Sequence, residues 1–211
     1  MDIGVSRVKD ASARETGPPA SAGELEELRA EVQRLTRENR GLKMAVAELE
    51  RIVDRDTLTP LFNRRYFINA LIKRKARLER HDEPCALLFV DVDSLKAIND
   101  AHGHGAGDFA LIEIAERLKA SIRQTDIAAR MGGDEFAVLL DQVDEAGAQE
   151  KGESLCRAIA DQPAVFNDVP LDLSVSIGFI MINADEHEDD LVARADQAMY
   201  RAKQQKRKAA A

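Results

Sequence analysis

The chain has 211 residues, of which 45% are hydrophobic and 32% charged, and its formal net charge is −8 at pH 7. This negative charge disfavours general electrostatic attraction to nucleic acid or to an anionic membrane surface, so an anionic ligand must be held by local cations or by a metal ion. The sequence contains no apolar stretch of membrane-spanning length, and its first residues lack the apolar segment of a secretory leader, so we expect neither a membrane span nor a leader. We therefore expect a cytoplasmic protein with no nucleic-acid partner and no membrane partner.

Residues 1–20 are predicted to form a disordered tail, because they are small, polar and interrupted by proline and glycine. A heptad pattern follows over residues 21–55. Its a positions are Leu25, Val32, Asn39, Val46 and Val53, and its d positions are Leu28, Leu35, Leu42 and Leu49. Valine at a with leucine at d favours two parallel strands, and a buried Asn39 pairs best with its own copy. The pattern therefore predicts a parallel homodimeric coiled coil rather than a helix that packs on its own domain.

A globular domain is expected over residues 56–211, with the helix breaker Pro60 close to its start. Apolar periodicity predicts helices from near Asn63 to Leu78 and at 94–102, 107–122, 145–162 and 189–205. Strands are predicted at 85–93, 126–131, 135–141 and 171–182. The connection between the second and third of these strands is too short for a parallel crossover. The predicted fold class is therefore α/β (α+β), with a mixed, largely antiparallel central sheet covered by helices.

Two glycines and two carboxylates occupy this short connection. Gly132 and Gly133 suit a tight hairpin with positive φ, and their missing β-carbons let a ligand lie against the backbone. Asp134 and Glu135 follow at the edge of the turn. By themselves, these residues favour a purely structural hairpin, so a functional interpretation depends on what lies beside the turn.

A second pair of carboxylates, Asp91 and Asp93, ends the continuous apolar strand at 85–93. Because these residues are two apart, their side chains can point to the same face of the sheet. Two acidic clusters at strand ends of one sheet can jointly hold a hard cation such as Mg²⁺, which prefers a few carboxylates and the oxygens of substrate phosphates. The residues themselves therefore favour metal-dependent phosphate chemistry over two unrelated, solvated strand ends.

Five segments occur in an order typical of one family: DTLTPLFNRR, DVDSLKAINDAHGHGAGD, RQTDIAARMGGDEF, SVSIGF and ADQAMYRAK. Over about residues 56–208 the chain resembles the GGDEF family of diguanylate cyclases. The resemblance implies a nucleotidyl-cyclase fold with a polymerase-palm-like sheet. It also implies the condensation of two GTP molecules into cyclic di-GMP, with release of two pyrophosphates and with Mg²⁺ or Mn²⁺ as the cofactor.

The resemblance assigns a metal and catalytic centre to this chain. Asp91 matches a metal ligand, with the Val92 carbonyl as a backbone ligand, and Asp134 matches the second acidic ligand. Glu135 matches an essential carboxylate that either assists the metal or activates the attacking hydroxyl. The sequence leaves the division of roles between Asp134 and Glu135 open. Lys96 matches a phosphate-binding position, and we expect it to act as a catalytic residue together with Asp134 and Glu135.

The resemblance also assigns the substrate-binding residues. Asn99 and Asp108 match the positions that read the guanine base. The chemistry fits, because an aspartate can accept from guanine N1–H and N2–H₂ together, which adenine cannot offer. Gly132 and Gly133 would let the backbone of the hairpin approach the phosphates.

Two cations of the last predicted helix, Lys203 and Arg207, match phosphate-binding positions, and their spacing of four places them on one helical face. The family has glycine before and asparagine after this arginine, whereas the chain has Lys206 and Lys208. Arg207 is therefore also compatible with a solvated basic tail.

Arg123 and Asp126 have the RxxD spacing that precedes the glycine turn in this family and marks a product-binding inhibitory site. By itself, this spacing usually indicates an ion pair on a protein surface. Its fixed distance from the turn favours the inhibitory site.

The family chemistry also explains the coiled coil. Each domain binds one GTP, so catalysis needs two domains face to face, which a parallel homodimer would tether. The alternative is a catalytically idle GGDEF domain that acts as a receptor for cyclic di-GMP or GTP, or as a signalling scaffold. An idle domain is expected to have substitutions in the family motif, whereas this chain keeps the motif residues at 132–136 and Asp91.

Overall fold

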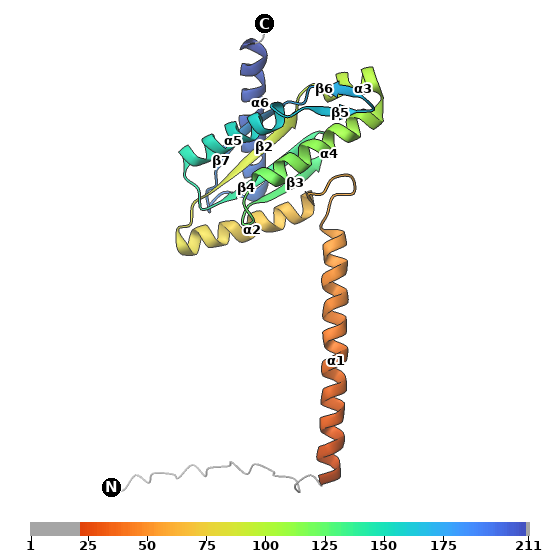
Figure 1. Ribbon diagram of the computed structural model, residues 1–211. Coiled ribbons are helices and arrows are strands. Elements are labelled where there is room, and N and C mark those ends of the chain that lie inside the picture. Colours follow the sequence, from red (N-terminus) through yellow and green to blue (C-terminus); the bar gives the residue numbers. More distant parts are fainter. Residues whose placement is uncertain (1–21, 210–211) are drawn as a thin grey trace, which may run out of the picture. The chain divides into compact units, whose positions relative to one another are not determined.

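The computed structural model describes residues 22–209, so the predicted disordered tail at 1–20 lies outside the described residues. The chain divides into two compact units after Glu50. In its described part, the first unit consists of one long helix, and the second unit contains the sheet (Figure 1).

Helix α1 runs without interruption from Ala22 to Val53. Its apolar heptad side chains between residues 23 and 46 are all exposed, by 47% to 62%: Leu25, Leu28, Val32, Leu35, Leu42 and Val46. Arg34 donates along the helix to Glu31 at 2.7 Å and to Glu38 at 3.2 Å, so part of the charged surface is paired within the helix itself. An apolar stripe that meets no other element of its own unit is suited to packing against a second helix.

The second unit is built on a five-stranded sheet with the order β1-β3-β4-β2-β7. Its strands are β1 (Phe62–Asn63), β2 (Cys85–Val92), β3 (Ile127–Gly132), β4 (Glu135–Asp141) and β7 (Val175–Met181). β1 runs parallel to β3, and the other neighbouring pairs are antiparallel. This arrangement confirms the predicted mixed, largely antiparallel sheet.

Helices cover both faces of this sheet (Figure 1). Those of the described second unit are α2 (Arg64–His81), α3 (Leu95–His102), α4 (His104–Ser121), α5 (Glu145–Ala160) and α6 (Glu188–Ala209). Leu88 and Val90 of β2 enter the core beneath α4 and α5, whereas Leu87 and Phe89 enter the core beneath α2 and α6. Burial on both faces explains why β2 is apolar throughout rather than at alternate positions. No helix within residues 22–209 combines the length and apolarity needed to cross a lipid bilayer.

The prediction of one strand over residues 171–182 is wrong at its amino-terminal end. Leu171 belongs to β6 (Val169–Leu171), which pairs with β5 (Ala164–Phe166) in a separate hairpin, and the sheet strand begins only at Val175. Asn167 and Asp168 form the turn of this hairpin, with φ of 49° and 66°. Asparagine and aspartate tolerate such left-handed angles better than other residues with side chains, so this pair was the turn signal that the sequence carried.

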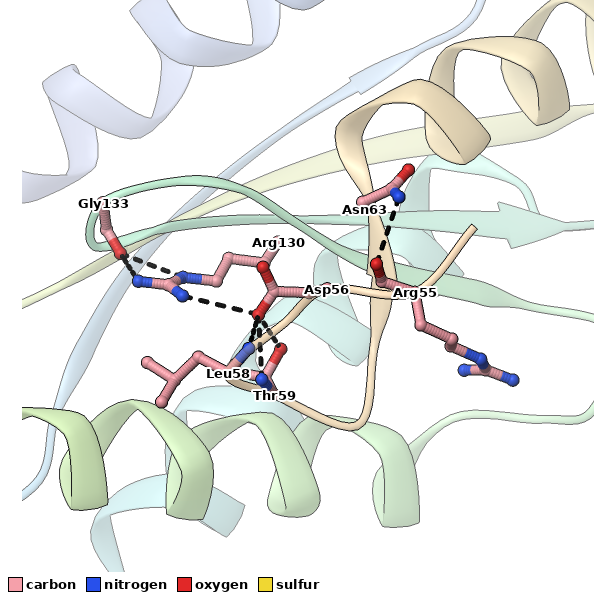
Figure 2. A network of polar contacts seen from close by, with 7 residues as sticks. All are labelled: Arg55, Asp56, Leu58, Thr59, Asn63, Arg130 and Gly133. Carbon is pink, nitrogen blue, oxygen red and sulfur yellow. Dashed lines mark hydrogen bonds and ion pairs between the residues drawn. The ribbon is translucent and has the colours of Figure 1, made fainter. Parts of the chain in front are cut away.

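The predicted start of a helix near Asn63 is confirmed, and the same side chain joins two elements. Its Oδ1 accepts from the Tyr66 amide at 3.0 Å and caps α2. Its Nδ2 donates to the Val53 carbonyl at 2.6 Å. It also donates to the Arg55 carbonyl at 3.1 Å (Figure 2). Asn63 thus ties the end of α1 to the start of α2.

Candidate active site

The turn between β3 and β4 has the geometry that its two glycines predict. Gly132 pairs with Glu135 across the turn, with only Gly133 and Asp134 between them. Gly132 and Gly133 have φ of 150° and 52°, which residues with a β-carbon rarely adopt. A β-carbon at either position would meet no heavy atom within 4 Å, so the backbone faces open space. A ligand can therefore lie directly against this turn.

Strands β2 and β4 bring the predicted metal ligands together. Asp91 and Glu135 are direct partners in the antiparallel register, and the Val92 amide donates to the Asp134 carbonyl at 3.1 Å. Side chains of directly opposed residues project from the same face of a sheet. The end of this strand pair therefore presents two carboxylates that lie far apart in the sequence.

The surroundings of the two opposed carboxylates disfavour their ionised forms. Burial raises the pKa of Asp91, and the nearby Lys203 offsets this effect only in part. Burial, followed by the negative charges of Asp196, Asp134 and Asp91, raises the pKa of Glu135. A raised carboxylate pKa means that the surroundings disfavour the ionised form, so a bound cation would relieve the site.

The donor set fits Mg²⁺ only in combination with other oxygens. Among the side chains that the structure describes, no three of His, Cys, Asp or Glu lie close enough together to make a metal site on their own. Mg²⁺ usually takes one or two protein carboxylates and completes its shell with water and substrate phosphates. Asp91, Glu135 and the Val92 carbonyl are the groups that could supply the protein part.

Helix α6 carries the predicted phosphate-binding Lys203 to this site. A β-carbon at Gly178 of β7 would lie 2.0 Å from the Met199 backbone nitrogen, so only glycine lets α6 pack this closely on the sheet. Lys203 Nζ then forms an ion pair with Asp91 Oδ1. The predicted phosphate ligand and the predicted metal ligand are thus direct neighbours.

A residue that the sequence interpretation left outside the site, Lys206, also reaches it. Its Nζ donates to Asp93 Oδ2 at 2.5 Å and to the Val175 carbonyl at 3.2 Å. The hydroxyls of Ser174 and Ser176 donate to the same carboxylate at 3.0 and 2.8 Å. Three contacts within the protein therefore hold Asp93, and Lys206 supplies the cation next to this strand end.

The predicted base-reading residues also come together. Asn99 lies on α3 and the exposed Asp108 on α4. The Asn99 amide packs against Gly107, the residue that precedes Asp108. Lys96 is exposed on α3, three residues before Asn99 and hence on the same side of that helix.

The RxxD residues lie at the other end of β3. Asp126 is only 8% exposed, and its carboxylate accepts from the backbone amides of Arg123 at 2.9 Å and Asp141 at 3.1 Å. The Arg123 side chain is exposed beside a cavity of about 270 Å³ that is also lined by Glu150 and Lys151. Asp126 thus holds the turn, while Arg123 is available to a ligand.

A polar network connects the start of the second unit to the glycine turn (Figure 2). Asp56 Oδ1 accepts from the amide and hydroxyl of Thr59, both at 2.8 Å, and from the Leu58 amide at 3.2 Å. Arg130 bridges this carboxylate, at 3.4 Å, to the Gly133 carbonyl, at 2.7 Å. Arg130 therefore links the glycine turn to the segment that follows α1.

This network predicts a pH-dependent contribution to stability. Burial raises the pKa of Asp56, but hydrogen bonds from Thr59 and the charge of Arg130 outweigh it, so the net pKa lies below the ordinary value of 3.8. A lowered folded-state pKa stabilises the protein above the unfolded pKa, and this contribution is lost as the pH falls through the folded value. Asp56→Asn should therefore cost about 1 kcal/mol at pH 7.

Urea denaturation of the parent and of Asp56→Asn measures this difference at several pH values. The difference should shrink below about pH 4. Asp172→Asn, at an exposed position, serves as the matched control and should show no difference. An equal cost at pH 7 and pH 3 would contradict the role of the carboxylate charge.

Residues 53–209 match the protein family described as "Diguanylate cyclase, GGDEF domain". The chain is 36% identical to diguanylate cyclase TpbB of Pseudomonas aeruginosa over 187 residues, which make up 87% of this chain and 41% of TpbB. It is 40% identical over 167 residues to the bifunctional diguanylate cyclase/cyclic di-GMP phosphodiesterase MucR of the same species, with coverage of 79% and 24%. The chain thus spans less than half the length of these curated relatives.

Among solved structures, the coiled coil and GGDEF domain of DgcB from Caulobacter crescentus, in complex with c-di-GMP, match with a TM-score of 0.73 and 26% identity. The match covers 84% of this chain and 94% of that one. Diguanylate cyclase SiaD from Pseudomonas aeruginosa, in complex with its activator SiaC, also gives a TM-score of 0.73, at 31% identity, with coverage of 86% and 68%. The long helix followed by a mixed sheet therefore has a close structural counterpart in DgcB.

Proposed function

Because this chain belongs to the GGDEF diguanylate cyclase family, we propose that it is an active cyclase, which condenses two GTP molecules into cyclic di-GMP and releases two pyrophosphates. The observation that carries the proposal is the opposed pair of Asp91 and Glu135 beside the open glycine turn. An idle receptor or scaffold would not need both carboxylates in a place where burial disfavours their charge.

Asp91, the Val92 carbonyl and the Asp134–Glu135 pair would hold Mg²⁺ or Mn²⁺ together with the triphosphate. Such an ion, when bound, neutralises phosphate charge and lowers the pKa of the attacking 3′-hydroxyl. Gly132 and Gly133 leave room for the phosphates against the backbone. Glu135 either completes the cation site or accepts the proton of the 3′-hydroxyl.

Substrate binding is proposed to use both helix layers. Asn99 and Asp108 would read guanine, because Asp108 can accept from N1–H and N2–H₂ together. Lys203 lies beside Asp91, within reach of phosphates bound at the strand end. Lys96 and Arg207 are exposed and would approach the phosphates from α3 and from the end of α6.

The active form is proposed to be a homodimer. One domain carries one set of site residues, whereas two phosphodiester bonds must form between two GTP molecules. A parallel coiled coil over residues 21–55 would bring two domains of residues 56–211 together. The exposed apolar stripe of α1 supports this pairing, and Asn39 at an a position would select the in-register dimer.

Incubation of the purified chain with GTP and Mg²⁺, followed by chromatography and mass spectrometry of the nucleotides, tests the proposal. Cyclic di-GMP and pyrophosphate should appear in a ratio of one to two, with no cyclic product from ATP. Binding of cyclic di-GMP without turnover of GTP would favour the receptor instead.

Product feedback is proposed to act through Arg123, since its exposed guanidinium can bind a phosphate while Asp126 maintains the turn. Arg123→Ala should weaken the binding of cyclic di-GMP by at least about tenfold, because a hydrogen bond between charged groups is worth about 1.5 kcal/mol or more. The late slowing of progress curves should disappear, while early velocity stays within about twofold of the parent.

Full progress curves at matched GTP concentrations, together with calorimetry of cyclic di-GMP binding, measure both effects. The exposed neighbour Gln124 provides the control, since Gln124→Ala should change neither. If the curves of Arg123→Ala bend as those of the parent do, the residue takes no part in feedback.

A further inference from the structure

Gly107 lies inside a helix, where glycine is unfavourable unless a contact requires it. It is buried near the start of α4 and immediately precedes Asp108. Its neighbour two residues earlier, Gly105, belongs to the same helix but is exposed. The two glycines differ in the space available for a β-carbon, which is free of close contacts at Gly105 but not at Gly107.

A β-carbon at residue 107 would collide with the side chain of Asn99 on α3. It would lie 2.1 Å from Oδ1, 2.8 Å from Cγ and 3.0 Å from Nδ2, and these are the three nearest heavy atoms. The collision therefore involves the end of a side chain rather than the backbone of α3. Alanine at this position would displace the Asn99 amide and leave the two helices in place.

Among the residues that the structure describes, none makes a polar contact that would hold the Asn99 side-chain oxygen against such a displacement. Its Oδ1 is fully buried, and no group within residues 22–209 donates a hydrogen bond to it. A buried amide oxygen without a donor is rare in proteins. Its position is consequently set by packing, and the space that it fills is the one that the missing β-carbon leaves free.

We propose that Gly107 is a positioning residue for base recognition, because its missing β-carbon lets the Asn99 amide lie against α4 directly beside Asp108. The two groups proposed to read guanine are thereby presented as one unit on α3 and α4. This inference rests on the proposed GTP-binding function, but the packing that it describes can be tested without a ligand.

The first experiment follows the side-chain amide of Asn99 by ¹H–¹⁵N NMR in the full chain without nucleotide. Its signals are identified by their loss in Asn99→Ala. In Gly107→Ala they should shift, whereas in Gly105→Ala they should stay, because that β-carbon would make an ordinary 3.6 Å contact with Phe166. The thermal midpoint of Gly107→Ala should not fall, since alanine favours helix. Unshifted Asn99 signals in Gly107→Ala would overturn the proposal.

The second experiment measures nucleotide affinity by calorimetry in Mg²⁺. The probe is α,β-methylene-GTP, in which the bond that the reaction breaks is replaced by one that cannot be cleaved. Gly107→Ala and Asn99→Ala should each weaken binding roughly tenfold, the loss expected for one hydrogen bond to the base. The double variant should bind within about twofold of Asn99→Ala, since both changes remove the same contact. Fully additive losses, or unchanged binding by Gly107→Ala, would overturn the proposal.

The two experiments separate this inference from the proposed function. If the parent binds α,β-methylene-GTP no better than α,β-methylene-ATP, guanine recognition by Asn99 and Asp108 is wrong, whatever the amide signals show. If the parent prefers the guanine nucleotide but the Asn99 signals do not move in Gly107→Ala, the proposed recognition of GTP is retained and the proposed role of Gly107 is wrong.

Discussion

Glu135→Gln should abolish the formation of cyclic di-GMP from GTP while the protein remains folded. The substitution keeps the size of the side chain but removes the negative charge that faces Asp91 across β2 and β4. That charge is needed in the transition state whether Glu135 completes a cation site or accepts the proton of the 3′-hydroxyl. Loss of one preorganised electrostatic contact of this kind reduces turnover by roughly 100- to 1000-fold.

The same substitution should not lower stability. Burial, followed by the charges of Asp196, Asp134 and Asp91, raises the pKa of Glu135. A carboxylate whose pKa is raised by folding is less favourable in its ionised form in the folded protein than in the unfolded chain. At neutral pH, a glutamine of the same shape avoids this cost, so the thermal midpoint is expected to stay equal or to rise.

Steady-state rates of product formation and thermal unfolding curves measure the two effects together. The matched control is Glu116→Gln, an exposed position on α4, which should change neither quantity. Turnover by Glu135→Gln above about a tenth of the parent rate would remove this carboxylate from the chemistry.

The sheet was predictable from sequence wherever a local pattern determines the structure. The apolar run of β2 indicated a strand buried on both faces, and the short connection with Gly132 and Gly133 required an antiparallel neighbour. The β5–β6 hairpin was not predicted, because its turn signal, the Asn167–Asp168 pair, is a weak one: asparagine and aspartate are common in turns of many types and do not by themselves indicate a hairpin.

The contacts within the candidate site could not be predicted from the sequence motifs. The motif indicated Lys203 and Arg207 as the cations of the last helix, yet Lys206 is the residue that reaches Asp93. Adjacent helical residues point about 100° apart, so the exact rotation of α6 decides which cation meets the strand end. That rotation depends on packing around Gly178, which no spacing in the sequence reveals.

The contact of Gly107 with a neighbouring helix could not be predicted from the sequence either. In the sequence it is a glycine near the start of a predicted helix, and no pattern shows why glycine is needed there. In the structure, glycine is needed because a β-carbon would collide with Asn99 on a different helix. Steric requirements between elements become visible only once the chain is folded, and the signal that could have indicated this one is a glycine in a helical segment that otherwise favours alanine.

Removal of residues 1–50 should make specific activity depend on protein concentration. The cut lies at the boundary between the two units. It keeps Val53 and Asp54, whose contacts with Asn63 and Arg65 belong to the second unit. If two copies of α1 pair, they hold two domains at an effective concentration in the millimolar range, whereas free domains meet only by collision. The truncated protein should therefore be monomeric and lose activity on dilution.

A dilution series over roughly three orders of magnitude, run beside light scattering, tests this expectation. The specific activity of the full chain should stay flat within about twofold, while that of the truncated protein should fall at least about tenfold at the dilute end, because dimerisation has become bimolecular. Removal of residues 1–20 alone leaves the heptads intact and should behave like the full chain. If the truncated protein keeps its activity per molecule at the lowest concentration, the domains pair without α1, and its apolar stripe must serve a different partner.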